Sequence, residues 1–208
     1  MSEYHKIDSV FKRDPATKNR TFIEGEWARP EFGYLADLLW RGTEKVDGTN
    51  IRISRSLIGG RSNNAQLPAK LVPTLTEIQD RLSLSALPES TILYGEGYGA
   101  GIQSGGIYRL DQGFILFDAL INGNWQDRET LEGIANDLSL AIVPELQSLP
   151  LTTWIEGIRN RTAYEHSRVS QHEKIPNEGV VLRPLIELRD RRGERIITKL
   201  KFRDFPNV

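Results

Sequence analysis

The sequence predicts an α+β domain built on antiparallel sheet. Residues 50–57 alternate apolar and polar side chains as a half-buried strand does, while residues 71–84 place leucine and isoleucine at helical spacing. Strands joined by turns, with helices inserted between them, are typical of this fold class. The predicted strands are 50–57, 91–94, 113–121, 179–185 and 195–202. The predicted helices are 71–84, 128–140 and 152–164, with Thr152 or Thr153 as the cap of the last one.

Dipeptides that contain glycine mark the expected turns between these elements. A hairpin turn is expected at Gly59–Gly60, a second at Asn122–Gly123, and a third turn at Arg192–Gly193. Residues 95–106 are rich in glycine and are expected to form a loop after the second strand. The formal match of this loop to a dinucleotide-binding fingerprint is discounted, because no helix is predicted to start there.

The length and composition of the chain predict one soluble globular domain spanning residues 1–208. The chain has no cysteine, which excludes disulfides, thiolate catalysis and Cys-based zinc sites. It has neither an apolar run long enough to cross a membrane nor the apolar core of a signal peptide, so a cytoplasmic location is expected.

Charge is unevenly distributed along the chain. The formal net charge is −1, yet residues 183–203 hold eight lysines and arginines against three acids. Such a local basic face can hold phosphates although the total charge is near zero. For residues 189–195 the favoured interpretation is a solvated hairpin with mixed charges.

A reactive lysine is the strongest chemical signal. Residues 44–50 read EKVDGTN and precede a predicted strand, so Lys45 would lie in a loop at the strand's edge, presented by a turn at Asp47–Gly48. A lysine becomes a nucleophile when it is desolvated or crowded by other cations. Taken alone, the segment fits a surface turn with an exposed lysine equally well.

Further charged and aromatic residues follow in order at the ends of strands. They are Glu96, Phe117, Asp118, Glu178, Lys199 and Lys201. The two lysines lie on one face of the last strand, because side chains alternate with period two. Two like charges on one face are costly unless an anion neutralises them, and a triphosphate would do so.

In this order the segments resemble the motifs of the covalent nucleotidyltransferase superfamily, which contains ATP-dependent DNA ligases, RNA ligases and mRNA-capping enzymes. The resemblance extends from Lys45 to Lys201. It is greatest to the ATP-dependent RNA ligases, because Thr49–Asn50 is typical of that branch, whereas DNA ligases usually carry arginine where Asn50 stands. The stretch 95–108 also resembles the RNA branch. This likeness implies two antiparallel sheets with flanking helices and ATP in the cleft between them.

The resemblance implies that five residues contact the adenine, the ribose or the phosphates of the bound nucleotide. Glu44 and its neighbouring backbone would contact adenine, on which Phe117 would stack. Glu96 would hold the ribose hydroxyls, Asn50 would place the phosphate end, and Arg61 would contact the ribose or a bound 5′-phosphate. From the residues alone, Phe117 could equally be a core residue and Glu96 an acid on the surface. Arg52 and Arg55 lie near Arg61 in the sequence and could take its role.

The same resemblance assigns the chemistry to four further side chains. Lys45 would attack the α-phosphorus of ATP with pyrophosphate leaving, while Lys199 and Lys201 would bind the α-phosphate. Glu178 would position the metal or orient Lys45. Mg²⁺ is the expected ion, with Mn²⁺ as an alternative.

The expected substrate is RNA with a 5′-phosphate and a 3′-hydroxyl end. DNA ligases and capping enzymes carry an oligonucleotide-binding domain after the segment that resembles residues 199–201. We expect no such C-terminal domain here, and an accessory protein could supply further contacts to the substrate. The alternatives are a minimal ATP-dependent DNA ligase and a non-catalytic module that binds nucleotides or nucleic-acid ends. An unrelated structural domain would require the ordered motifs to arise by chance.

Overall fold

The computed structural model describes residues 3–62, 64–162 and 164–205, and the chain divides into two compact units. The six-stranded unit comprises Met1–His5, Val46–Val143 and Val169–Glu173. The five-stranded unit comprises Lys6–Lys45, Pro144–Arg168 and Lys174–Val208. Each unit has its own sheet and its own core.

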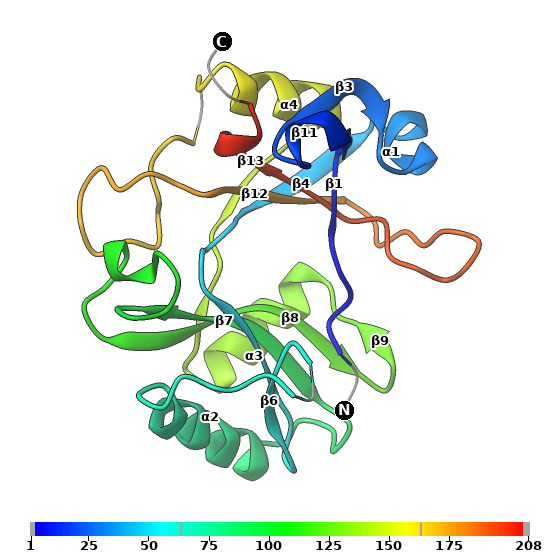
Figure 1. Cartoon of the computed structure of the whole chain (residues 1–208). Coiled ribbons are helices and arrows are strands. Elements are labelled where there is room, and N and C mark those ends of the chain that lie inside the picture. The colour runs from blue at the N-terminus through cyan, green and yellow to red at the C-terminus, as the bar shows by residue number, and fades with distance from the viewer. Residues whose placement is uncertain (1–2, 63, 163, 206–208) are drawn as a thin grey trace. The chain divides into compact units, whose positions relative to one another are not determined.

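The six-stranded unit is an antiparallel sheet with one short parallel edge. Its strand order is β10-β8-β7-β5-β6, with β9 paired to β8 and β10 parallel to β8. The strands are β5 (Thr49–Ile53), β6 (Ile58–Gly60), β7 (Ile92–Gly99), β8 (Gln112–Ile121), β9 (Asn124–Trp125) and β10 (Ala141–Ile142). The helices are α2 (Val72–Leu84), η2 (Gly105–Ile107) and α3 (Arg128–Asp137), and α2 and α3 pack on the sheet (Figure 1).

Alternation along β5 and β7 gives this sheet one apolar and one polar face. Ile51, Ile53 and Leu93 are fully buried in the core that α2 and α3 cover. The intervening residues, such as Asn50 and Glu96, therefore share the opposite face, because successive strand residues point to opposite sides.

The five-stranded unit is a mixed sheet with its own helices. Its strand order is β1-β13-β12-β4-β11, in which only the pair of β1 and β13 is parallel among the described strands. The strands are β1 (Asp8–Ser9), β4 (Leu39–Glu44), β11 (Glu145–Pro150), β12 (Gly179–Pro184) and β13 (Thr198–Lys201), with a separate hairpin of β2 (Phe11–Arg13) and β3 (Phe22–Trp27). The helices are η1 (Pro15–Thr17), α1 (Pro30–Tyr34), α4 (Leu151–Arg159) and η3 (Phe202–Asp204).

Two tryptophans anchor α4, the helix labelled in Figure 1, to the sheet of this unit. Trp40 on β4 and Trp154 on α4 are at most 1% exposed, and the Trp154 indole N–H donates to the Trp40 carbonyl at 3.0 Å. Gly42 makes this contact possible, because a Cβ there would lie 2.3 Å from the Trp154 ring. The packing fixes β4, which leads directly into Lys45.

The α+β fold class is confirmed, as are the hairpin at Asn122–Gly123 and the turn at Arg192–Gly193. Asn122 and Gly123 have φ of 51° and 78°, and Ile121 pairs with Asn124. Asp190 stabilises the later turn by accepting hydrogen bonds from the backbone N–H groups of Arg192 and Glu194 at 2.8 and 2.9 Å.

Three local expectations are wrong. Gly59–Gly60 is part of β6, and the turn lies at 54–57, where the Ser54 hydroxyl and backbone bond to Leu57. Residues 95–99 continue β7 rather than form a loop. Pro150 is the cap of α4, which ends at Arg159, well before the predicted end at 164; residue 163 of that predicted helix lies outside the described residues. Among the described residues no helix has the length and apolar character to span a membrane.

Candidate functional site

Lys45 lies directly after β4, beside the entrance of β12. Its backbone N–H donates to the Gly179 carbonyl at 2.9 Å, which extends the β4–β12 ladder by one residue. Its ammonium nitrogen lies 2.6 Å from Glu178 Oε2. The strand pairing therefore places the predicted nucleophile and the predicted carboxylate in direct contact, although 133 positions separate them in the sequence.

Lys201 approaches the same carboxylate from the other side. Gly179 pairs with Lys201 across β12 and β13, and the Lys201 ammonium lies 2.5 Å from Glu178 Oε1. Lys199 is two residues earlier on β13, so its side chain leaves the sheet on the same face as that of Lys201. At the entrance of β12, the Glu178 carboxylate therefore lies between the ammonium groups of Lys45 and Lys201. Lys199 extends from the same face of β13 as Lys201.

The charges around Glu178 determine its protonation. Its side chain is 11% exposed, and burial alone would raise its pKa. The positive charge of Lys45 and the hydrogen bond from Lys201 outweigh burial, so the pKa of Glu178 is held below its ordinary value. Glu178 is therefore ionised at neutral pH and holds Lys45 in place.

The backbone around Glu178 is fixed by neighbours that the sequence analysis did not single out. Asn177 is buried, and its Oδ1 accepts the Gly179 N–H at 3.0 Å. Gly179 has φ of +155°, and a Cβ there would lie 2.0 Å from the Leu200 carbonyl oxygen. An Asn two residues before a Gly at a strand entrance was the available signal, since Asn side chains commonly bond to backbone two residues on.

Glu44 is buried rather than open to a ligand. It is 2% exposed, its Oε2 accepts the Arg168 N–H at 2.7 Å, and its Oε1 accepts the Ser167 hydroxyl. Any adenine contact at this position would have to come from the backbone or follow a rearrangement of these bonds. Ser167 and Arg168 had no sequence signal as partners, because 123 and 124 positions separate them from Glu44.

The polar face of the six-stranded unit brings together other predicted residues. Asn50 on β5 is directly opposite Glu96 on β7, so their side chains are neighbours on one face. The Asn50 Oδ1 is buried and has no hydrogen-bond partner among the described residues. Gly48 packs closely here, because a Cβ would lie 2.3 Å from the Gly97 carbonyl oxygen and 2.9 Å from Glu96 Cγ. An amide acceptor and a carboxylate side by side fit a ligand that donates hydrogen bonds, such as ribose hydroxyls.

Phe117 also lies on β8 of this unit, half-buried beside an aromatic cluster. Its ring lies 5.1 Å from that of Tyr4, at 70° to it. The next residue, Asp118, is fully buried and accepts the Tyr4 hydroxyl at 2.9 Å. Burial and the nearby Asp118 raise the pKa of Tyr94 to about 12, against an opposing effect of Arg52. The contact with Tyr4 therefore holds the Phe117 ring on one side, while the side chain remains partly exposed.

Arg61 is exposed and immediately follows Gly60, which pairs with Ile51. It therefore lies near the Asn50 end of β5. The predicted site residues consequently fall into two sets. Lys45, Glu178, Lys199, Lys201 and Glu44 belong to the five-stranded unit, and Asn50, Arg61, Glu96 and Phe117 belong to the six-stranded unit.

The carboxylate at position 178 has capacity for a metal beside its two ammonium partners. An ionised carboxylate has about four acceptor positions, and the two ion pairs use one on each oxygen. Within the described residues no group of three or more His, Asp or Glu side chains is placed to hold a metal. A hard cation here would need phosphate oxygens and waters as its other ligands, which is the usual arrangement for Mg²⁺.

Comparisons with known proteins identify the family and the fold. The sequence profile described as RNA ligase matches residues 39–201. No curated protein matches the chain. Solved structures of a Naegleria gruberi RNA ligase share its fold: a variant with AMP and Mn (TM-score 0.66, 20% identity), a variant with ATP and Mn (0.66, 18%) and the enzyme with PPi (0.65, 21%).

Each alignment covers 97% of this chain and 56% of the Naegleria protein, so the chain spans little more than half the length of these relatives. At such identities the structural likeness shows the fold alone. The profile match covers most of the chain and includes Lys45, Glu96, Glu178 and Lys201. The chain therefore belongs to the RNA ligase family.

Proposed function

We propose that this protein is an ATP-dependent RNA ligase that works through a covalent bond between Lys45 and AMP. The Lys45 nitrogen attacks the α-phosphorus of ATP, pyrophosphate leaves, and the amine loses a proton. AMP then passes to the 5′-phosphate of an RNA end, and the 3′-hydroxyl of a second end displaces it. The observation that carries this proposal is the contact of Lys45 with Glu178, which Lys201 also contacts.

Glu178 acts as an orienting group in this proposal. A general base works best when its pKa is near the working pH. The pKa of Glu178 is lowered by Lys45 and Lys201 despite burial, so it is a poor proton acceptor at neutral pH. Its bond to the ammonium group instead aims the Lys45 side chain, and an incoming α-phosphate would draw Lys199 and Lys201 toward itself.

Lys199 and Lys201 share one face of β13, so an incoming triphosphate would meet two positive charges there. Mg²⁺, or Mn²⁺ in its place, would supply charge neutralisation on the phosphates, with Glu178 as its protein ligand. On the six-stranded unit, Asn50, Glu96, Arg61 and Phe117 are the proposed contacts to ribose, phosphate and adenine.

The relatives support the nucleotide assignment. The Naegleria RNA ligase has been solved with ATP and Mn, with AMP and Mn, and with PPi. These are the substrate, the transferred group and the leaving group of the reaction proposed above. An accessory protein that adds contacts to RNA, and a cytoplasmic location, remain further parts of the proposal.

The test is covalent labelling with α-labelled ATP and Mg²⁺. The wild-type chain should acquire an acid-labile labelled adduct, Lys45→Ala should acquire none, and Lys70→Ala, which changes an exposed lysine of the six-stranded unit, should label normally. Lys199→Ala should slow labelling by on the order of 10²–10³, as a lost transition-state contact does. No labelling of the wild type would favour a module that only binds nucleotides or ends.

Sealing assays then identify the substrate. Matched RNA and DNA nicks with 5′-phosphate and 3′-hydroxyl ends should be sealed at different rates, with RNA preferred. Preference for the DNA nick, with labelling intact, would favour the minimal DNA ligase instead.

A further inference from the structure

The five-stranded unit contains a basic cavity, most of whose lining residues have no role in the proposed chemistry. Its volume is about 760 Å³, and its lining comes from the N-terminal segment, the β2–β3 hairpin, β13 and η3. Seven of the lining residues are lysines or arginines and two are aspartates. The proposed phosphate-binding residues Lys199 and Lys201 form part of its wall, together with Asp8 and Ser9 of β1.

Pairing of β1 with β13 builds this wall. Ser9 lies beside Lys199, and the Thr198 hydroxyl donates to the Asp8 carbonyl at 3.1 Å. The parallel pair brings the N-terminal lysines to the last strand, although about 190 positions separate the two segments. The register of two strands, rather than a flexible tail, therefore places the cations together.

Several of these cations have acidic partners, and others do not. Arg13 bonds to the buried Asp204 at 2.9 Å, and Lys12 pairs with the exposed Glu26 at 3.2 Å. Lys6, Arg20 and Arg203 are exposed and have no ion pair among the described residues. The cavity thus retains an excess of positive charge that a polyanion would neutralise.

We infer that this cavity binds the phosphodiester backbone of the RNA strand next to the end that is sealed. The inference rests on the proposed function and names where its substrate lies. Phosphate contacts from lysine and arginine fix the position of a nucleic acid without reading its sequence. Lys199 and Lys201 in the wall of the cavity would place the RNA end at the bound adenylate.

The size of the cavity favours a chain of phosphates over a single small anion. Cavities of about 300–1,000 Å³ enclose drug-sized molecules, whereas pyrophosphate has only two phosphate groups. The exposed cations are also distributed over three segments, around Lys6, Arg20 and Arg203. The β- and γ-phosphates of ATP offer the same chemistry, so the experiment separates the two sources.

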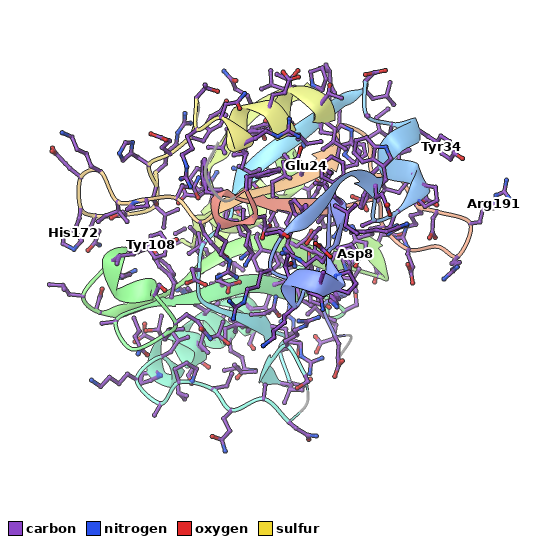
Figure 2. The ribbon with its side chains drawn as sticks, turned by 45° about the horizontal axis from the view of Figure 1, so that its top comes forward. Asp8, Glu24, Tyr34, Tyr108, His172 and Arg191 are labelled. Atoms are coloured by element: carbon purple, nitrogen blue, oxygen red, sulfur yellow. The ribbon has the colours of Figure 1, made fainter. Side chains whose placement is uncertain are left out.

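The experiment measures binding of an RNA that cannot be sealed. The probe is a fluorescent single strand of about 12 nucleotides with a 5′-hydroxyl and a 3′-phosphate end. The cavity variant is Arg20→Gln with Arg203→Gln in the full chain. The matched control is Arg191→Gln with Arg192→Gln, which removes the same charge from the exposed hairpin of the same unit, where Figure 2 shows Arg191 extending outward.

The cavity variant should bind the RNA roughly 5- to 30-fold more weakly than wild type. Its log–log salt slope between about 50 and 200 mM should be shallower by about 1.4, since each lost contact to a single strand removes about 0.7. The hairpin variant should bind as the wild type does. All three proteins should unfold at the same temperature and form the adenylate adduct at the same ATP concentration.

Three results would overturn the inference. Equal losses in the cavity and hairpin variants, or no loss in either, would show that the RNA does not occupy this cavity. A raised ATP requirement for adduct formation and weaker inhibition by pyrophosphate, with RNA binding unchanged, would assign the cavity to the triphosphate. Failure of the wild type to form the adduct is a separate result that refutes the proposed function, because RNA binding is measured independently.

Discussion

Replacing Glu178 by glutamine tests how the centre of the proposed site is held together. The substitution keeps the shape of the side chain and removes the charge that lies 2.6 Å from the Lys45 ammonium and 2.5 Å from that of Lys201. Two ammonium groups then face each other without a counterion. Breaking a buried pair by removing one partner costs about 3–5 kcal/mol.

The exposure of the three side chains favours the lower end of that range. Glu178 is 11% exposed, Lys201 14% and Lys45 21%, so water screens the remaining charges in part. A loss of about 3 kcal/mol lowers the melting temperature by about 6–12 °C in a chain of this size. Calorimetry at pH 7 measures the shift, and Glu165→Gln, an exposed position of the same unit, should change it by less than about 2 °C.

The pH dependence gives this prediction a defined sign. The pKa of Glu178 is lower in the folded chain than in the unfolded chain, because Lys45 and Lys201 outweigh burial. Its stabilising contribution is therefore fully present above the unfolded value of about 4.3 and is lost as pH falls through the folded value. The difference in melting temperature between wild type and Glu178→Gln should shrink below about pH 4. Equal melting temperatures at pH 7, or a difference that does not shrink in acid, would refute the reasoning.

Three further substitutions test the packing and the aromatic contact. Gly42→Ala puts a Cβ 2.3 Å from the Trp154 ring and should lower the free energy of unfolding in urea by about 1–3 kcal/mol. A urea midpoint equal to that of the wild type would disprove the close contact. Tyr4→Phe removes the donor to buried Asp118 and should cost about 1–3 kcal/mol, measured by the same unfolding; no loss would show that the bond does not stabilise the fold. Phe117→Leu should raise the ATP concentration needed for half-maximal adduct formation by roughly 5- to 150-fold, from about 1–3 kcal/mol of lost base stacking, and an unchanged requirement would assign Phe117 to the core alone.

The sequence was sufficient for the elements whose signal is local. The helix at 72–84, the strand at 112–121 and the Asn122–Gly123 hairpin follow from spacing and turn chemistry within a short window. β4 was missed, although it leads into Lys45, because its residues LWRGTE lack clean alternation and include a glycine that a tryptophan contact requires. β1, β2, β3, β10 and β11 are short or irregular, and their pairing depends on distant segments.

The site was predictable as a set of residue types but not as a set of contacts. Glu178 was expected to orient Lys45 or hold metal, and its direct contact with both Lys45 and Lys201 depends on the register of three strands. Nothing local indicated that the Glu44 carboxylate would be occupied by Ser167 and Arg168. Long-range pairing of this kind is decided by the whole fold, so sequence order alone does not reveal it.

Neither compact unit is a continuous stretch of chain, and this has a consequence for how the protein folds. Each unit collects three segments, so no single cleavage or truncation yields either one intact. β4 pairs with β11 and β12, which follow it in the sequence by about a hundred residues or more. Closing such long loops slows folding more than it lowers the final stability. The nucleophile would consequently become functional only late in folding, once both ends of the polypeptide have joined the same sheet.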